Sequence, residues 1–401
     1  MRTPVNRFHS LFAALVAGGA VFAADADWPQ FRGPTRDNKV SGFRAPATWP
    51  KTLKQGWKVT VGDAVASPVL AGETIYAFTR QGKEEVLTAL DAATGKKNWE
   101  YRYEAEELRG PASSFKGPRS TPAVGDGKVA TLGVGGVVSC VDAKTGKEVW
   151  QKKTNAKPPF YTSDSPLVAE GLCVIHLGDR QKGELTAFDL GKGDVKWKWA
   201  GDAPSYGSPV LATISGVKQV VVVTPKNLVG VSFSDGKLLW QTPFMAGRYP
   251  TGTPVVDGDT VIVPGRAFAI VRTGDKFEAK ELWKGQAPHQ YNTPVLKEGV
   301  LYGLSGRGKS TKLYAQDAKT GKVLWEGKDE HGECGAVLDA GSVLLEQSSD
   351  SDLVAFKPSK TGYEEIAKYK VADSPTWAMP IVAGNRIYVK DRESITLWTI
   401  E

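Results

Sequence analysis

Short runs of β-branched and aromatic residues, each bounded by turn residues, recur along the chain after its N-terminal leader. Residues 74–78 (TIYAF) and residues 220–223 (VVVV) are two examples. Runs of this length and composition predict β-strands. No segment after the leader keeps the 3.6-residue period of an amphipathic helix. The pattern therefore predicts an all-β fold.

A longer pattern repeats with little change and ends in tryptophan. Its clearest copies are residues 87–99 (LTALDAATGKKNW), 138–150 (VSCVDAKTGKEVW) and 313–325 (LYAQDAKTGKVLW). Looser copies end at Trp197, Trp240 and Trp283, and a degenerate copy ends at Tyr369. The Asp-Ala-x-Thr-Gly-Lys core predicts a β-hairpin, because Asp and Thr bond their own backbone and Gly adopts positive φ. We expect the large tryptophan ring to lie flat between neighbouring units.

Each copy is preceded by a Ser/Thr-Pro pair, an apolar strand, a glycine and a second strand. The prolines of these pairs are Pro68, Pro122, Pro166, Pro209, Pro254 and Pro294, and Ala336 and Pro380 mark the seventh and eighth positions. From Pro68 to Pro380 the chain advances 312 residues in seven steps, or about 45 residues per step. This is the length of a four-stranded propeller blade, so we predict an eight-bladed β-propeller.

The two ends of the repeat region predict how the ring closes. The eighth unit has three strands, at residues 379–382, 386–390 and 395–400, and lacks the final tryptophan strand. Residues 54–59 form an additional strand before the first unit, and this strand carries Trp57. We predict that it completes the last blade, which removes open sheet edges. The predicted organisation is a signal peptide (1–23), an N-terminal extension (24–52) and the propeller domain (53–401).

The N-terminus predicts export. Arg2 and Arg7 precede an apolar run of about 12 residues, and small residues allow cleavage near Ala23 or Ala26. The run is too short to span a bilayer, and the first cysteine is Cys140. We therefore expect a periplasmic or secreted protein without an integral membrane segment or a lipid anchor.

Charge and cysteine content add little chemistry. A formal net charge of +7 over 401 residues is mild and does not predict a nucleic-acid-binding surface. Cys140, Cys173 and Cys334 are the three cysteines, and none is adjacent to another. We expect three small buried side chains, although a Cys140–Cys173 bridge stays open. We also expect a monomer.

The Ala-x-Asp-x-x-Thr-Gly-Lys-x-x-Trp repeats resemble those of the pyrroloquinoline-quinone (PQQ) propeller superfamily. That superfamily includes quinoprotein alcohol dehydrogenases and BamB-type outer-membrane assembly factors. Residues 27–34 (DWPQFRGP), with Arg36, Asp37 and Asn38, are similar to the start of exported proteins with PQQ-like repeats. The resemblance covers residues 27–401. It implies either protein capture or PQQ-dependent oxidation.

Three further features of the sequence bear on its chemistry. Residues 303–310 (GLSGRGKS) fit the phosphate-loop pattern, but residues 311–317 continue as a strand instead of the helix that phosphate binding needs. His176, His289 and His331 share no metal-ligand spacing. The resemblance to dehydrogenases implies a vicinal disulfide, a Ca²⁺ or lanthanide ion and a catalytic Asp around PQQ, and the chain has no adjacent cysteines. We therefore predict no metal and no cofactor, with PQQ and Ca²⁺ as the alternative.

Connections between neighbouring units are the best candidates for a binding site, because functional loops on a rigid scaffold carry recognition. The connection from Trp99 to Pro122 is the longest, at 23 residues, and it is charged and aromatic. The next longest, from Trp150 to Pro166, contains residues 158–161 (PPFY) and Asp164.

One position in these connections is enriched in large polar and aromatic residues. Three residues before the proline of each repeat, successive units carry Val65, Arg119, Ser163, Tyr206, Thr251, Tyr291, Glu333 and Trp377. We predict that Arg119, Tyr206, Tyr291, Glu333 and Trp377 line the mouth of the ring and bind a planar or anionic group. His289 and His331 lie two positions earlier in their loops, and we predict that they add protonatable groups near the same mouth. The alternative is a solvated loop surface whose rings only pack.

Together these features predict an exported, non-enzymatic propeller that binds a protein or a small ligand through one face. The alternative function is that of a PQQ-dependent oxidoreductase.

Overall fold

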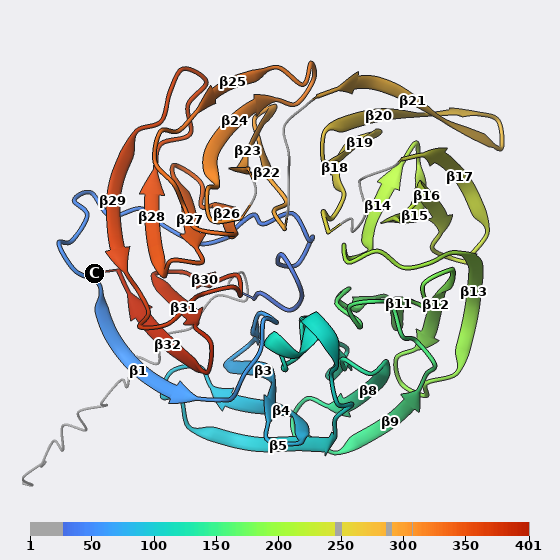
Figure 1. Cartoon of the computed structure of the whole chain (residues 1–401), viewed down its shortest axis with the longest axis horizontal. Coiled ribbons are helices and arrows are strands. Elements are labelled where there is room, and N and C mark those ends of the chain that lie inside the picture. The colour runs from blue at the N-terminus through green and yellow to red at the C-terminus, as the bar shows by residue number, and fades with distance from the viewer. Residues whose placement is uncertain (1–26, 245–250, 286–290, 307, 401) are drawn as a thin grey trace, which may run out of the picture.

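The computed structural model describes residues 27–244, 251–285, 291–306 and 308–400. Within them, 32 strands form eight four-stranded antiparallel sheets around a common axis (Figure 1). The only helix in these ranges is the short 3₁₀ helix η2 (Gly110–Ser114). None of the described helices has the length and hydropathy needed to cross a membrane. The predicted all-β, eight-bladed propeller is therefore confirmed.

We number the blades from the first sheet that is continuous in sequence. Blade 1 consists of β2 (Val69–Ala71), β3 (Thr74–Gln81), β4 (Glu84–Asp91) and β5 (Lys97–Glu104), and blade 2 of β6 (Ala123–Gly125), β7 (Lys128–Leu132), β8 (Val137–Asp142) and β9 (Glu148–Lys153). Blade 3 consists of β10 (Leu167–Ala169), β11 (Leu172–Gly178), β12 (Lys182–Asp189) and β13 (Val195–Asp202), and blade 4 of β14 (Val210–Ile214), β15 (Val217–Val223), β16 (Asn227–Ser232) and β17 (Leu238–Pro243). Blades 5 to 7 consist of β18 (Val255–Asp257), β19 (Thr260–Val263), β20 (Arg266–Thr273) and β21 (Lys276–Lys284); β22 (Val295–Lys297), β23 (Val300–Ser305), β24 (Lys312–Asp317) and β25 (Val323–Glu326); and β26 (Gly335–Asp339), β27 (Leu344–Ser348), β28 (Asp352–Phe356) and β29 (Glu365–Lys370).

Blade 8 joins the two ends of the chain. Its strands are β30 (Ile381–Ala383), β31 (Arg386–Lys390), β32 (Ser394–Thr399) and, on the outside, β1 (Lys54–Thr60). Val59 of β1 pairs with Ile395 of β32 in antiparallel register. The blue β1 and the red β32 lie side by side in Figure 1. The predicted closure by the N-terminal strand is confirmed.

The joints between blades explain the tryptophan of the repeat. Trp150 of blade 2 donates its indole N–H to the Leu190 carbonyl of blade 3 at 2.9 Å. Its ring lies against Gly193, where a Cβ atom would stand 2.7 Å from the ring and where φ is +75°. The same pairing of a Trp with the hairpin Gly of the next blade occurs at Trp57 and Gly95, Trp99 and Gly146, Trp197 and Gly236, and Trp283 and Gly321. The predicted position of the tryptophan between blades is confirmed, and the glycine is required by close packing as well as by its φ.

The Ser/Thr before each proline links the innermost strands of neighbouring blades. Ser165 of blade 3 donates its backbone N–H to the Ser208 hydroxyl of blade 4 at 2.9 Å. Equivalent bonds run from Met379 to Ser67, Ser67 to Thr121, Thr121 to Ser165, Ser208 to Thr253 and Thr253 to Thr293. We call this set the hydroxyl series. Blade 7 has Gly335-Ala336 in place of Ser/Thr-Pro, and the Asn292 side chain accepts the Gly335 N–H at 3.0 Å instead.

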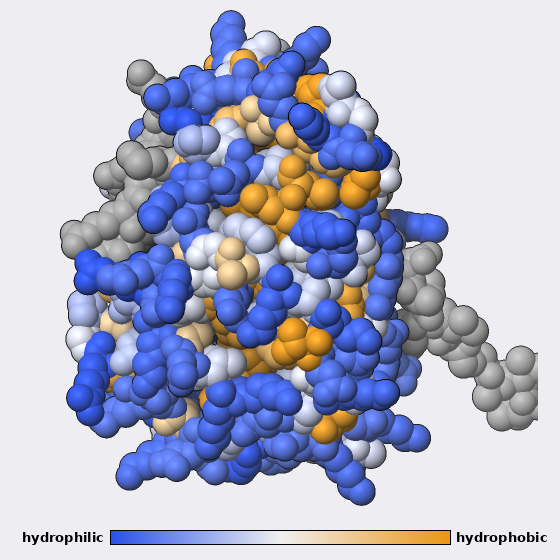
Figure 2. Space-filling model, turned by 90° about the vertical axis from the view of Figure 1, so that its right-hand side faces the viewer, coloured by the Kyte–Doolittle hydropathy of each residue, from blue (hydrophilic) through white to orange (hydrophobic). Residues whose placement is uncertain are grey.

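The outer rim is mainly polar. Figure 2 shows the rim that lies on the right in Figure 1, where hydrophilic side chains cover most of the surface and apolar areas lie between them. Large hydrophobic side chains exposed on the outer strands of blades 3 to 5 are Val195 (48%), Leu238 (43%) and Leu282 (50%). They stand one per strand, as single exposed apolar residues normally do.

Candidate functional site

The antiparallel order of each blade places two kinds of turn at opposite ends of the ring. Asp-Ala-x-Thr-Gly-Lys hairpins join the third and fourth strands at one end, which we call the hairpin face. The connections between blades, and the turns between the second and third strands, lie at the other end, which we call the loop face. Arg119, Tyr206, Tyr291, Glu333, His331 and Trp377, the predicted site residues that the structure describes, belong to connections on the loop face.

The longest of these connections, residues 105–122, folds back onto blade 1. Its Pro118 carbonyl accepts the N–H groups of Val65 at 3.0 Å and Ala66 at 2.9 Å. A Cβ atom at Gly117 would stand 1.9 Å from the Asp63 carbonyl oxygen, so only glycine fits there. This connection is therefore anchored to the ring at its C-terminal end.

Arg119 organises the tip of the same connection. Its guanidinium donates to the carbonyls of Ala112 at 3.2 Å and Phe115 at 2.9 Å. Burial lowers the pKa of Arg119, but an arginine stays protonated. The Phe115 ring, 36% exposed, meets Trp377 of blade 8 edge to face with centroids 5.1 Å apart. Arg119 thus holds the backbone of an aromatic pair that faces solvent.

Tyr206 belongs to the connection into blade 4. Its hydroxyl accepts the Phe160 N–H at 3.1 Å, and the two rings stand 6.1 Å apart. The Tyr161 hydroxyl accepts the backbone N–H of Arg109 at 3.2 Å. Burial is the larger effect and lowers the pKa of Arg119, whereas electrostatic interactions with Tyr206 and Tyr161 raise it. The structure therefore brings Arg119, Tyr206 and Trp377 into one cluster with Phe115, Phe160 and Tyr161. In the sequence these three aromatic residues are signalled only as parts of the two longest connections.

The other predicted residues lie elsewhere on the loop face. Tyr291 is 53% exposed, and its N–H donates to the Thr251 hydroxyl at 3.1 Å. Glu333 is exposed, and its N–H donates to the Ser349 hydroxyl at 2.9 Å. Neither of these two bonds reaches the Arg119 cluster.

The two predicted histidines differ in what can be said of them. The His331 side chain is buried, and its Nδ1 lies 3.4 Å from a carboxylate oxygen of Glu346 in β27. Burial raises the pKa of Glu346. His289 lies outside the described residues.

A second buried pair lies beneath the connection into blade 3. The Asp164 carboxylate accepts the backbone N–H of His176 at 3.1 Å, and both side chains are buried. Burial raises the pKa of Asp164 to about 7 and lowers that of His176 to about 4. The His176 Nε2 lies 3.1 Å from the Asp202 carbonyl.

The centre of the ring is filled by residues 27–40, which we call the axial segment (Figure 1). Arg36 is 2% exposed and donates to the carbonyls of Ser165 (3.1 Å), Pro166 and Pro209. Arg32 is 1% exposed and donates to Thr293 (3.1 Å) and Pro294 (2.9 Å). Burial lowers the pKa of Arg32 to about 10 and that of Arg36 to about 9.

Further bonds of the axial segment reach the remaining neighbours. The Asn38 amide donates to the Val337 carbonyl at 3.0 Å, and the Trp28 N–H donates to the Leu70 carbonyl at 2.8 Å. The Pro29 carbonyl accepts the Val124 N–H at 2.8 Å. Together with the arginines, these bonds reach blades 1, 2, 3, 4, 6 and 7. Sequence reasoning noted Arg36 and Asn38 only as part of a resemblance and placed this stretch in an N-terminal extension.

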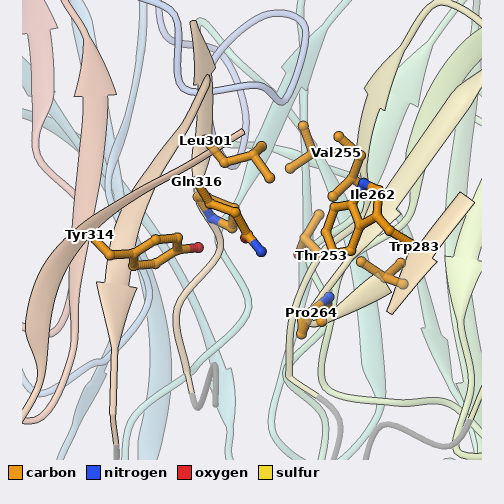
Figure 3. A pocket seen from close by; sticks show the side chains of 11 residues that line it. Thr253, Val255, Ile262, Pro264, Trp283, Leu301, Tyr314 and Gln316 are labelled. Atoms are coloured by element: carbon orange, nitrogen blue, oxygen red, sulfur yellow. The ribbon is translucent and has the colours of Figure 1, made fainter. Parts of the chain in front are cut away.

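Two cavities lie away from the predicted residues. The smaller, between blades 5 and 6, has a volume of about 10 Å³, room for about one water molecule (Figure 3). Tyr314 and Gln316 line it from one blade, and Ile262 and Trp283 from the other. The larger is a groove of about 480 Å³ between blades 1 and 2, lined by Thr74, Tyr76, Asn98, Trp99, Gly127, Asp142, Ala143 and Lys144. Neither cavity is lined by a predicted site residue.

The remaining chemical signals can be placed as well. Cys140, Cys173 and Cys334 are free thiols, so the Cys140–Cys173 bridge is not formed, although both side chains share one core cluster. The phosphate-loop lookalike connects β23 to β24, and its described residues, all but residue 307, contain no helix. Among the described residues, no group of three or more His, Cys, Asp or Glu side chains could hold a metal ion.

The chain is similar to known proteins of two kinds, outer-membrane assembly factors and quinone-dependent alcohol dehydrogenases. A family model described as "Outer membrane protein assembly factor BamB" matches residues 40–118, 83–327 and 250–369. The outer membrane protein assembly factor BamB of Burkholderia pseudomallei (strain K96243) is 25% identical over 357 residues, which are 84% of this chain and 85% of that protein. The dehydrogenase subunit of the quinone alcohol dehydrogenase of Acetobacter aceti is 35% identical over 149 residues, which are 33% of this chain and 19% of that protein.

Two solved structures share the fold. The quinohemoprotein alcohol dehydrogenase from Comamonas testosteroni superposes with a TM-score of 0.68 at 18% identity, covering 95% of this chain and 81% of that chain. BamB from Moraxella catarrhalis superposes with a TM-score of 0.64 at 15% identity, covering 87% of this chain and 98% of that chain. At these identities the likeness shows the fold alone.

Proposed function

Because the chain belongs to the family of the outer membrane protein assembly factor BamB, we propose that it is an exported, non-enzymatic scaffold that binds a protein through its loop face. Export rests on the N-terminal signal, which predicts cleavage near Ala23 or Ala26. Fractionation of the native host and N-terminal sequencing of the mature chain test this part. Recovery in the cytoplasm with residues 1–23 intact would contradict it.

The Arg119 cluster is the observation that carries the proposal. Protein-binding surfaces are enriched in aromatic residues and arginine at their centre. Here Phe115 and Trp377 come from connections of different blades and meet at 5.1 Å, with Arg119 fixing the backbone under Phe115. A rigid ring holds both connections, so the aromatic pair is presented with little loss of conformational entropy on binding.

PQQ-dependent oxidation is the second candidate, supported by the local likeness to a quinone alcohol dehydrogenase. The residues of this chain do not fit PQQ with Ca²⁺. The sequence has no adjacent cysteines, the axial segment fills the centre of the ring, and the part of the chain that the structure describes offers no acidic cluster for the ion. We therefore propose no cofactor.

A photo-crosslinking amino acid at position 115, introduced in the native host, tests the binding face. We expect discrete adducts with an envelope protein, and we expect Trp377→Ala to remove them because it removes the edge-to-face partner of the ring. The matched control carries the same amino acid at position 238, which is 43% exposed on the rim. Equal adducts from both positions would reject the loop face. Dye-linked alcohol oxidation after addition of PQQ and Ca²⁺ would favour the second candidate.

A further inference from the structure

The two buried arginines of the axial segment donate to backbone carbonyls at the C-terminal ends of three connections of the loop face. Arg36 holds the carbonyls of Ser165 and Pro166, which follow residues 161–164 of the blade 3 connection. It also holds the Pro209 carbonyl, three residues after Tyr206. Arg32 holds the carbonyls that follow Tyr291. The axial segment thus meets the base of three connections of the loop face.

Guanidinium chemistry suits this task. Its N–H donors lie in one plane at fixed angles, so an arginine that binds two strands fixes the distance between them. Arg36 does this for the residues that directly precede β10 of blade 3 and β14 of blade 4. Because the side chain is 2% exposed, water cannot replace these bonds, and breaking them would leave a charge buried without partners.

The same stretches of backbone are also fixed from the neighbouring blade. The Ser165 N–H donates to the Ser208 hydroxyl, and the Ser208 N–H donates to the Thr253 hydroxyl. Each of these strand starts is therefore held at its N–H by the hydroxyl series and at its carbonyls by Arg36. A segment held on both sides has few ways to shift, so the loop that precedes it ends at a fixed point.

We infer that Arg32 and Arg36 are positioning residues of the loop face: from inside the ring, they set where the connections that carry Tyr161, Tyr206 and Tyr291 end. The functional meaning of this inference rests on the proposed function, in which the loop face binds a protein. Its physical content does not, because it concerns which backbone segments each arginine holds.

Hydrogen exchange measured by mass spectrometry on the full-length mature protein tests the inference without any partner. Arg36→Lys keeps the charge but loses the planar donor set. We expect amides of residues 161–169 and 205–214 to exchange about tenfold faster, because local opening there becomes easier. Arg32→Lys should accelerate residues 291–297 instead. Arg44→Lys, at an exposed position of the same N-terminal region, is the matched control and should change neither set.

The pattern of acceleration decides the outcome. Strand β31 of blade 8, which neither arginine contacts among the described residues, is the internal reference for global unfolding. The inference is supported if exchange accelerates only in residues 161–169 and 205–214 of Arg36→Lys, and only in residues 291–297 of Arg32→Lys. Equal acceleration of β31 in both variants, or no acceleration in either, overturns it. Failure of the crosslinking experiment would leave this result intact, so the two proposals can fail separately.

Discussion

Two neighbouring buried groups in blade 3 respond to pH in opposite directions. Asp164 has a folded-state pKa of about 7 instead of 3.8, so the folded protein binds a proton that the unfolded chain releases. Stability from this group is present at low pH and is lost as the pH rises toward 7. His176 has a folded-state pKa of about 4 instead of 6.5, so its stability is present above pH 6.5 and is lost as the pH falls toward 4. Between pH 4 and 6.5 the two effects oppose each other.

Removing either group should therefore reveal how the unfolding free energy depends on pH through the other group alone. Relative to wild type, we expect the unfolding free energy of Asp164→Asn to increase with pH from 4 to 6.5, by up to about 1.4 kcal/mol per pH unit. His176→Gln should show the reverse slope. Urea unfolding at pH 4.5, 5.5 and 6.5 measures both. Variant curves that run parallel to wild type would contradict the burial of these charges.

At the scale of elements, the joint between two blades depends on a glycine that has two separate requirements. Gly193 has a φ of +75°, and its missing Cβ makes room for the Trp150 ring. Gly171, in another hairpin of the same blade, has a φ of +73° and no atom within 4 Å of a Cβ position. The two positions separate backbone strain from packing.

Gly171→Ala should cost about 1–2 kcal/mol of unfolding free energy, the cost of a left-handed backbone for alanine. Gly193→Ala should cost that amount and about 1–3 kcal/mol more, because the methyl group collides with the indole. Thermal and urea unfolding of the two variants measure the difference. Equal losses would show that the tryptophan ring moves aside without cost.

The hydroxyl series makes a second prediction at this scale. Thr121 is buried, and its hydroxyl accepts the Ser67 N–H at 3.1 Å across the joint between blades 1 and 2. Thr121→Val keeps the shape but leaves that N–H without a partner, so we expect a loss of about 1–3 kcal/mol in unfolding free energy. Thr121→Ser keeps the hydroxyl and should lose less. A larger loss in the serine variant would contradict a hydrogen-bonding role.

At the scale of the whole molecule, ring closure and the filled axis can be separated by two deletions. Removing residues 27–40 takes away the axial segment but leaves β1 paired with β32. We expect lower stability with a single cooperative transition. Removing residues 27–60 also opens the edge of β32, which should cause aggregation or a broad transition. Urea unfolding and light scattering compare them, and identical behaviour would mean that β1 does not close the ring.

The fold could be predicted from the sequence because each blade carries its own local signals. The Gly193 hairpin and the Ser165-Pro166 pair each fix a turn or a strand start within a few residues. Arg36 carries no such signal, since its partners lie 129 and 173 residues away along the chain and it is indistinguishable locally from a solvated arginine. The pairing of His331 with Glu346 was hidden for the same reason, because an alternating strand pattern does not reveal which carboxylate will be buried beside a loop.

The bonds of the axial segment also determine the order of folding steps. Arg32 and Asn38 are made early in synthesis, but their partners Thr293 and Val337 lie 261 and 299 residues later. At about 5–20 residues per second, a ribosome needs roughly 15 to 60 s to cover such a distance. The axial segment can thus complete these bonds only after six blades and the first strand of the seventh have been synthesised. Until then the chain carries a cationic, tryptophan-containing segment without all of its partners, and placing that segment should be among the last and slowest steps of folding.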